Sequence, residues 1–361
     1  MGSTGELLQK LQEGRGDEAL RGLYALDGSD ASLEKGRERA VRVVRAFEAE
    51  FGARPEAALF SGPGRTEIGG NHTDHQHGRV LCGSVDLDML ACAAPNGTDL
   101  VRIQSEGYPA LEVDLRDLKV REEEKNSSPA LVRGVAARLA ELGCRPAGFD
   151  AYVTSTVLSG SGLSSSAAYE ILVATIIDCF FGGGTLDPVE RAKVGQYAEN
   201  VYFGKPCGLM DQMGSSVGGA VAIDFADPAA PVVKKVEYDF TRSGHALCIV
   251  DTGSCHADLT DDYADITREM GAVAAHFGKK FLRDVDEGAF RAALPQLRQE
   301  CGDRAVLRTM HFFEEDCRAE QEAQALEQGD FAAFLALVDQ SGLSSALNLQ
   351  NTWSAAAPQQ Q

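Results

Sequence analysis

One run of residues constrains the fold of this chain more than any other. Between residues 149 and 157, apolar and polar side chains alternate, which predicts a half-buried β-strand. A glycine- and serine-rich loop follows at residues 159–167, and residues 168–181 are then apolar nearly all round. A helix without a polar face belongs in a protein core. The run therefore predicts strands layered on helices, with the loop at the start of a buried helix.

That loop is the first candidate binding site. A buried helix N-terminus presents unpaired N–H groups and the positive end of the helix dipole, and glycines let a phosphate come close to the backbone. A P-loop would need a lysine, and none lies between Ser159 and Glu170. A dinucleotide fingerprint would need Gly or Ala where Ser165 stands. An anion site and a helix start capped by serines without a ligand both remain open.

In the rest of the chain, segments with the helical spacing of apolar residues alternate with segments that have the two-residue spacing of a β-strand. This alternation favours an α+β fold. The pair Asn96-Gly97 predicts a hairpin between two of the strands. We expect an N-terminal extension over residues 1–30, a first lobe over 31–240 and a second over 241–361. The predicted helices are 30–51, 131–142, 168–181, 187–203, 261–277, 289–300, 304–328 and 331–338, and the predicted strands are 57–61, 80–94, 100–105, 149–157, 220–225, 232–238 and 246–251.

Charge and cysteine content limit the classes of partner. The chain has 361 residues, with 34 Lys and Arg against 54 Asp and Glu, so its formal net charge is −20. Such an acidic protein repels nucleic acids and anionic membranes, and we expect neither as a partner. The 9 cysteines are odd in number and form no C-x-x-C pair, which indicates reduced thiols in the cytoplasm. We also expect no apolar run that approaches the ~20 residues of a membrane span.

A second candidate site is the polar segment between Gly64 and Gly78. So many hydrogen-bonding side chains beside flexible glycines suit a polyol or a metal ion. A zinc site needs three or four converging ligands, and no distant His-Asp pair completes one, so a zinc hydrolase is a remote alternative and a solvated turn another. The side chains concerned are Arg65, Asn71, His72, Asp74, His75 and His77.

The third candidate is a pair of carboxylates, Glu199 and Asp211. We expect the first late on a helix and the second in the loop after it. Beside an anion-binding loop, they would supply a magnesium ligand and a general base, which phosphoryl transfer to a hydroxyl requires. Taken alone, two acidic residues among 54 are as readily surface charges.

Together, three segments resemble the galactokinases, within the GHMP family of small-molecule kinases. Residues 65–74 are similar to the galactokinase signature, residues 159–168 to the phosphate loop of the family, and residues 207–212 to the segment with its catalytic aspartate. The resemblance implies a two-lobed α+β fold of mixed sheets packed with helices and an active site between the lobes. It also implies ATP-dependent phosphorylation of the anomeric hydroxyl of galactose, giving galactose 1-phosphate.

The resemblance implies a role for each matching residue. Asp211 would face the sugar hydroxyl, with Arg65 stabilising charge beside it, and Ser164 and Glu199 would hold Mg²⁺. The sugar would contact Asn71, His72, Asp74, Gly208 and Tyr263, and the ATP phosphates would contact Gly160, Ser161, Gly162, Leu163, Ser164, Ser165 and Ser166.

Four departures from the family pattern keep alternatives open. Asn71 replaces the usual glutamate, which favours a related substrate such as N-acetylgalactosamine or a uronic acid. Leu158 replaces a proline, and Ser128 and Leu131 stand where an aromatic pair often lines the adenine pocket. No glycine follows Gly342, so the third, glycine-rich motif is missing. We therefore expect a second lobe that is cut short, and a non-catalytic sugar-binding relative or an inactive fragment remain alternatives.

Overall fold

The computed structural model describes residues 1–157, 160–250 and 260–354, and it has an α+β fold in two compact units. Unit 1 comprises Met1–Arg65 and Ser84–Gly218, and unit 2 comprises Thr66–Gly83 and Gly219–Gln361. The chain passes from one unit to the other within strands β1 (Ala58–Gly69) and β2 (Arg79–Pro95). This division differs from the boundaries near residues 30 and 240 expected from the sequence, because one short segment before residue 84 joins the C-terminal unit. Those lobe boundaries stay a prediction.

The sheet of unit 1 is built around strand β5 (Phe149–Ser155). It pairs antiparallel with β2, from Met89 opposite Ser155 to Pro95 opposite Phe149, and parallel with β3 (Leu100–Ser105). Strand β4 (Leu111–Asp114) continues the order beyond β3, and β1 pairs with β2.

The predicted hairpin at Asn96-Gly97 is therefore wrong, because β5 lies between the strands that it was expected to join. The Asn96 amide donates to Leu100 O at 2.9 Å and to the Asp150 carboxylate at 2.8 Å, and Gly148 N donates to Thr98 O at 2.7 Å. The turn thus holds the beginning of a third strand.

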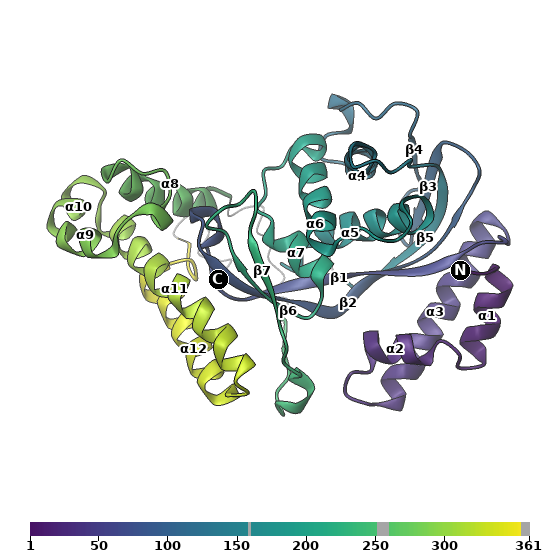
Figure 1. The fold of residues 1–361 in the computed structure, drawn as a ribbon, viewed down its shortest axis with the longest axis horizontal. Coiled ribbons are helices and arrows are strands. Elements are labelled where there is room, and N and C mark those ends of the chain that lie inside the picture. Colours follow the sequence, from purple (N-terminus) through teal and green to yellow (C-terminus); the bar gives the residue numbers. More distant parts are fainter. Residues whose placement is uncertain (158–159, 251–259, 355–361) are drawn as a thin grey trace. The chain divides into compact units, whose positions relative to one another are not determined.

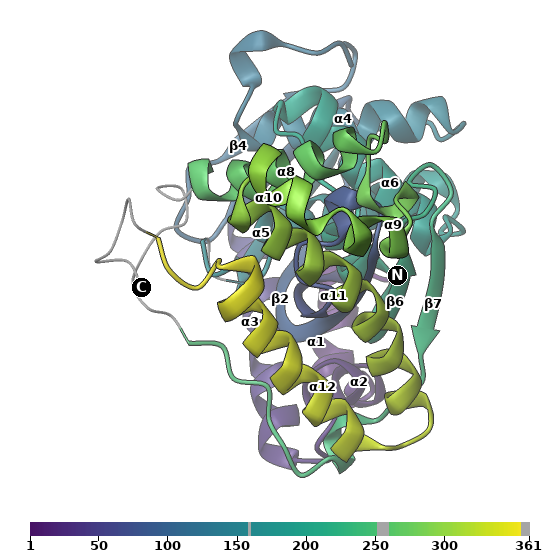
Figure 2. The ribbon, with the colours of Figure 1, turned by 90° about the vertical axis from the view of Figure 1, so that its left-hand side faces the viewer.

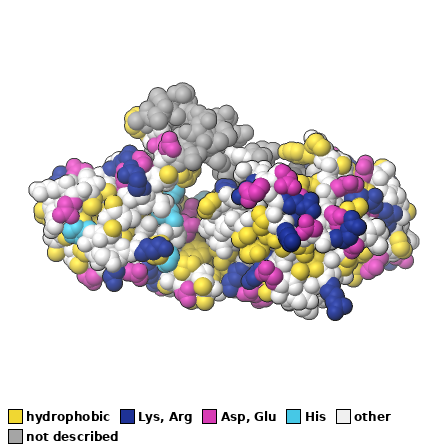
Figure 3. Space-filling view, turned by 90° about the horizontal axis from the view of Figure 1, so that it is seen from above, with side chains coloured by type: hydrophobic (Ala, Val, Ile, Leu, Met, Phe, Trp, Pro, Cys, Tyr) yellow, Lys and Arg dark blue, Asp and Glu magenta, His cyan; other side chains and the backbone are white. Residues whose placement is uncertain are grey.

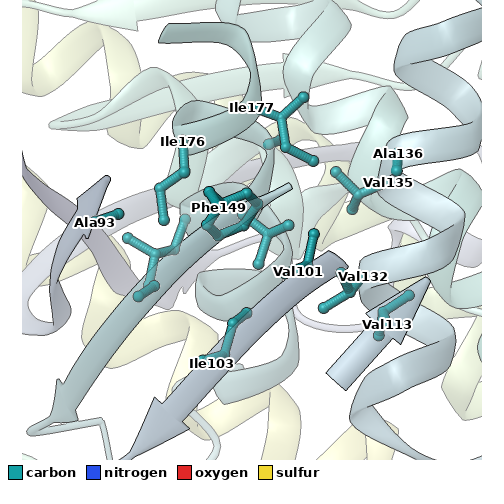
Figure 4. Packing of buried hydrophobic residues seen from close by; sticks show 14 of the residues in the cluster. Ala93, Val101, Ile103, Val113, Val132, Val135, Ala136, Phe149, Ile176 and Ile177 are labelled. Carbon is teal, nitrogen blue, oxygen red and sulfur yellow. The ribbon is translucent and has the colours of Figure 1, made fainter. Parts of the chain in front are cut away.

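Alternation along β2 explains why helices cover both faces of this sheet (Figure 1). Ala91 and Ala93 pack toward α4 (Ser128–Glu141) and α5 (Ser165–Ile177), in the cluster shown in Figure 4. Leu90, Cys92 and Ala94 pack on the opposite side, against α3 (Asp30–Phe51). Helices α1 (Thr4–Gln12) and α2 (Asp17–Tyr24) add to that second layer.

Helix α5 lies in the centre of the unit 1 core. Residues Ser165–Gly182 form a helix long and apolar enough to cross a membrane, with 61% of it buried. The expectation that no apolar run approaches this length is therefore corrected. The burial of Leu172, Ile176 and Ile177 among strand side chains accounts for the composition, since a core helix needs no polar face.

The segments after α5 largely follow the prediction. Helix α6 (Pro188–Tyr197) begins after Asp187, whose carboxylate accepts the N–H of Val189 at 2.8 Å. Asp211 lies in the first turn of α7 (Met210–Val217), which corrects its expected place in a loop. Two π-helical turns, η3 (Asp178–Gly182) and η4 (Ala198–Phe203), follow α5 and α6, and the 3-10 turn η2 (Glu122–Glu124) precedes α4.

In unit 2, residues 79–83 of β2 pair antiparallel with β6 (Ala220–Asp224), which pairs antiparallel with β7 (Val232–Val236). Helices α11 (Asp303–Glu327) and α12 (Phe331–Ser344) pack side by side (Figure 2). The remaining elements are α8 (Thr260–His276), α9 (Glu287–Ala292), α10 (Leu294–Glu300), η1 (Asp74–Gln76), η5 (Phe240–Arg242), η7 (Leu282–Asp284) and η8 (Ser345–Leu349).

Two predicted elements in unit 2 are wrong. The single helix expected at 289–300 is divided between α9 and α10, because Pro295 has no N–H to continue the first helix. Residues 246–250 form no strand and are exposed, and residue 251 of the predicted strand lies outside the described residues.

Strand β1 is longer than the segment 57–61 expected from the sequence, and it includes the first part of the predicted polar loop. A Cβ atom at Gly62 would lie 2.5 Å from Ala168 O, and one at Gly64 would lie 3.1 Å from Leu163 O. These glycines allow β1 to approach the start of α5 closely. These glycines are therefore explained by the close packing of a strand against a helix, and not by a turn in the chain.

Candidate active site

The glycine- and serine-rich loop adopts a strained turn before α5. Gly160 and Gly162 have φ of 77° and 78°, and Ser164, the residue before the helix, has φ of 54°. Arg65 N donates to Leu163 O at 3.1 Å, which anchors the loop to β1. The first N–H groups of α5 have no intrahelical acceptor, so this helix start suits an anion. Leu158 and Ser159 lie outside the described residues.

Arg65, Ser164 and Asp211 meet at this helix start. The Arg65 Nε atom lies 2.8 Å from Asp211 Oδ1, and its Nη1 atom donates to Gly162 O at 2.6 Å. The Ser164 hydroxyl donates to the other carboxylate oxygen, Oδ2. The structure thus brings together, within unit 1, the two residues expected to be catalytic and the loop expected to bind phosphate.

Glu199 lies beside the same loop and is almost fully buried. Its Oε1 atom accepts a hydrogen bond from the Ser166 hydroxyl at 3.2 Å and lies 3.6 Å from Lys205 Nζ. The structure therefore places Ser166, and not Ser164, next to Glu199, while Ser164 contacts Asp211. The hydroxyl that contacts Glu199 is therefore that of Ser166, whereas the expected metal ligands were Ser164 and Glu199.

Gln212 connects Glu199 to a second buried carboxyl group. Its Nε2 atom donates to Glu199 Oε2 at 2.9 Å and to Glu170 Oε2 at 3.0 Å. Burial on α5, and then the nearby Glu199 charge, raise the pKa of Glu170 well above its usual range. Neither Glu170 nor Gln212 was expected as a site residue from the sequence, although a lone glutamate in an apolar helix is an available signal.

In unit 2, the segment from Gly70 to Gly78 is a compact loop with positive φ at Gly70 (91°), His72 (61°) and His77 (63°). The His72 ring lies 5.7 Å from that of His75 and 5.5 Å from that of Tyr263, measured between ring centroids. Burial lowers the pKa of His72, and that of His75, to about 4. Both rings are therefore neutral at pH 7.

The geometry of this loop does not support the zinc alternative. His77 stacks on Phe281 at a centroid distance of 3.6 Å, so it is committed to packing. Over residues 1–157, 160–250 and 260–354, no three or more His, Cys, Asp or Glu side chains are grouped so that they could hold a metal ion.

The expected site residues thus fall into two clusters. Unit 1 contains Arg65, Gly160–Ser166, Glu199, Asp211 and Gly208, which is exposed just before α7. Unit 2 contains Asn71, His72, Asp74 at the start of η1, and Tyr263 in the first turn of α8. Residues 251–259, which precede Tyr263 and helix α8, lie outside the described residues. Near the expected adenine pocket, Ser128 begins α4 and Leu131 is buried in it.

Comparison with known proteins first defines the class of the protein. Residues 130–219 match the GHMP kinases N terminal domain, and residues 45–95 match the galactokinase galactose-binding signature. A crystal structure of Lactococcus lactis galactokinase complexed with galactose is 23% identical, with a TM-score of 0.68 over 86% of this chain and 80% of that chain. Methanococcus jannaschii mevalonate kinase gives a TM-score of 0.55 at 15% identity, over 84% and 82%. The chain has the GHMP kinase fold.

Curated relatives then define the family. Galactokinase from Streptomyces coelicolor is 33% identical over 292 residues, which cover 81% of this chain and 74% of the relative. Human galactokinase is 32% identical over 305 residues, which cover 82% and 75%. The chain belongs to the galactokinase family.

Proposed function

We propose that this protein transfers the γ-phosphoryl group of ATP to the anomeric hydroxyl of galactose, giving galactose 1-phosphate and ADP. Membership of the galactokinase family supports the reaction, and ATP use is inherent to GHMP kinases. The observation that carries the proposal is the contact of Arg65 and Ser164 with Asp211 at the N-terminus of α5. This contact joins a carboxylate, a fixed cation and an anion-binding helix start in one place.

The loop and the first turn of α5 are assigned to the ATP phosphates. Positive φ at Gly160 and Gly162 turns the backbone so that it leads directly into the helix. Phosphate oxygens would accept from the free N–H groups there and would gain from the positive end of the helix dipole.

Asp211 is assigned to the sugar hydroxyl through its Oδ2 atom. Arg65 occupies Oδ1 with two donors, so Oδ2, which now accepts from Ser164, is the oxygen open to exchange. The sugar oxygen forms a bond to the γ-phosphorus, the bond from that phosphorus to the β–γ bridging oxygen breaks, and ADP leaves. The hydroxyl proton passes to Asp211 Oδ2.

The residues around Glu199 fit a magnesium ion. Mg²⁺ prefers oxygen ligands and is commonly held by one or two carboxylates together with substrate phosphates and water. Glu199 and the Ser166 hydroxyl, 3.2 Å apart, offer such a donor pair next to the phosphate loop. When bound, the ion would neutralise charge on the phosphates. We assign it to Glu199 and Ser166, in place of the pair Ser164 and Glu199.

The loop Gly70–Asp74 and Tyr263 are assigned to the sugar. The neutral His72 ring can donate or accept a hydrogen bond, and the Asp74 carboxylate accepts one. Asn71 is directed differently, because its Nδ2 atom donates to Ser345 Oγ at 2.8 Å. Because Asn71 provides a neutral amide, already bonded to Ser345, where the family usually has a glutamate, N-acetylgalactosamine remains a second candidate substrate.

We propose small molecules as the partners and the cytoplasm as the location. The acidic composition supports the absence of nucleic-acid and membrane partners. On the face displayed in Figure 3, acidic and basic side chains are interspersed.

A coupled assay of ADP release against a panel of free sugars tests this function. We expect Mg²⁺-dependent turnover that is fastest with galactose. Faster turnover with N-acetylgalactosamine or a uronic acid would reassign the substrate. Sugar binding by calorimetry without turnover of any sugar would identify a non-catalytic relative and contradict the proposal.

A further inference from the structure

The backbone of the loop assigned to the sugar is in a conformation that its own residues do not favour. His72 has φ of 61°, a region that residues other than glycine rarely adopt. A Cβ atom at the preceding Gly70 would lie 2.4 Å from Arg79 O, so no larger residue fits there. A strained conformation of this kind persists only where its surroundings impose it.

One source of that constraint is Glu315, a fully buried residue of α11. Its Oε1 atom accepts from Gly70 N at 3.1 Å and from Asn71 N at 3.4 Å, although Glu315 lies 245 positions beyond Gly70 in the sequence. Ser341 Oγ donates to the same oxygen at 2.5 Å, and Arg318 pairs with the other. A buried ionised acceptor makes stronger hydrogen bonds than a neutral one, so the two N–H groups are firmly held.

A second source is His311, one turn earlier on α11 and also fully buried. Its Nε2 atom lies 2.8 Å from Asn71 O, and its Nδ1 atom lies 2.9 Å from Ser344 Oγ. A carbonyl oxygen only accepts hydrogen bonds, so Nε2 carries a proton. Burial lowers the pKa of His311, and in the neutral ring Nδ1 accepts from the serine. One face of α11 therefore holds three successive polar groups of the loop backbone: Gly70 N, Asn71 N and Asn71 O.

We propose that Glu315 and His311 are positioning residues, which hold Gly70–His72 in the conformation that presents His72 and Asp74 to the sugar. The inference rests on the proposed function, because it takes this loop as part of the sugar site. Neither residue lies in residues 65–74, 159–168 or 207–212, the three segments that carried the resemblance, or in the two matched family models. If α11 only stabilised the fold, weakening these contacts would lower stability without separating sugar binding from ATP binding.

The test compares variants of the full chain in two measurements. Glu315→Gln and His311→Leu each weaken the hold on the loop, whereas His311→Gln keeps a donor. Thr309→Val is the matched control, because Thr309 is buried on α11 and its hydroxyl donates to Ala305 O of the same helix. For each variant, KM is measured separately for galactose and for ATP, and galactose Kd is measured by calorimetry without nucleotide.

We expect Glu315→Gln and His311→Leu to raise the galactose KM and Kd about tenfold, as for the loss of one charge-assisted or buried hydrogen bond, with the ATP KM within about twofold. His311→Gln should recover part of the loss, and Thr309→Val should leave both KM values unchanged. Equal rises in both KM values, or a lower kcat and melting temperature with unchanged galactose Kd, would overturn the inference.

If Glu315→Gln and His311→Leu do not fold, Ser344→Ala decides. It loosens His311 and otherwise removes only a 3.5 Å hydrogen bond from Asn348, and an unchanged galactose KM in that variant overturns the inference. Failure of the proposed function shows earlier, in the wild-type protein. If that protein prefers another sugar of the panel, the same comparison is made with the preferred sugar.

Discussion

Arg65 donates two hydrogen bonds to a single carboxylate oxygen of Asp211, with Nε at 2.8 Å and Nη2 at 2.5 Å from Oδ1. Its third contact, from Nη1 to Gly162 O at 2.6 Å, ties the same guanidinium to the phosphate loop. The arginine therefore fixes the carboxylate and the loop relative to each other. Because both donors converge on Oδ1 while Ser164 contacts Oδ2, the two oxygens of Asp211 have different partners.

Asp211→Asn should leave the protein folded and still able to bind galactose, while kcat falls by about 10²–10⁴-fold, as expected for the loss of a positioned acid–base group. An amide cannot take the hydroxyl proton. The measurements are steady-state turnover and galactose binding by calorimetry. Turnover close to that of the wild-type protein would show that another group performs this step.

Ser164→Ala and Ser166→Ala should have separable effects. Ser166 contacts Glu199, so its loss should raise the Mg²⁺ concentration needed for half-maximal turnover and weaken Mg²⁺-dependent binding of ADP. Ser164 contacts Asp211, so its loss should change kcat with little effect on the Mg²⁺ requirement. Titration of both variants with Mg²⁺ makes the comparison, and the reverse pattern would restore Ser164 as the metal ligand.

Asn71→Glu should change the preference among sugars more than the affinity for ATP. The side chain donates to Ser345 Oγ in unit 2, whereas the phosphate loop belongs to unit 1. A carboxylate can only accept, so it would reverse this hydrogen bond and add a negative charge. The measurements are the KM values for each sugar of the panel and for ATP. Equal shifts in all of these values would contradict the assignment of the loop to the sugar.

Glu322 should make the stability of the protein depend on pH. Burial raises the pKa of Glu322 to about 8, against an ordinary value of 4.5, and neither carboxyl oxygen has a hydrogen-bond partner in the described part of the chain. The folded state therefore binds the proton more tightly than the unfolded state. Its contribution is fully present below pH 4.5 and is lost as the pH rises through about 8.

Glu322→Gln, which is neutral at every pH, should accordingly raise the melting temperature at pH 8.5 by at least about 2 °C, or roughly 1 kcal/mol in a large domain, relative to its effect at pH 5. Calorimetric melting at the two pH values measures this difference. Identical shifts at both values would mean that Glu322 is ionised throughout the range.

The parts of the structure that the sequence predicted well carry their signals locally. Helix α3 has the predicted limits of residues 30–51, since Ser29 caps its start and Gly52 ends it. Helix α5 and the loop before it were recognisable from composition alone. Arg65 and Asp211 were identified by resemblance, and the structure brings them together.

The parts that the sequence did not predict depend on distant contacts. Nothing near Asn96 indicates that β5, more than 50 residues later, inserts beside β2. The hold of Glu315 on Gly70 has no local signature, because a glutamate in a helix usually faces solvent. The pairing of Ser166 with Glu199 required knowing how the first turn of α5 is oriented.

The interleaved make-up of the units has a consequence for biosynthesis. Unit 1 is complete in sequence once residue 218 has been made, but Leu81, within the segment Thr66–Gly83 of unit 2, shares its core with Leu326 and Phe334. At ~5–20 residues per second, the roughly 245 residues between Leu81 and Leu326 take on the order of 12–50 s to synthesise. Throughout that interval the apolar segment around Leu81 has been synthesised but the helices that it packs against have not. The nascent chain is therefore a substrate for chaperones before the sugar-binding unit can fold.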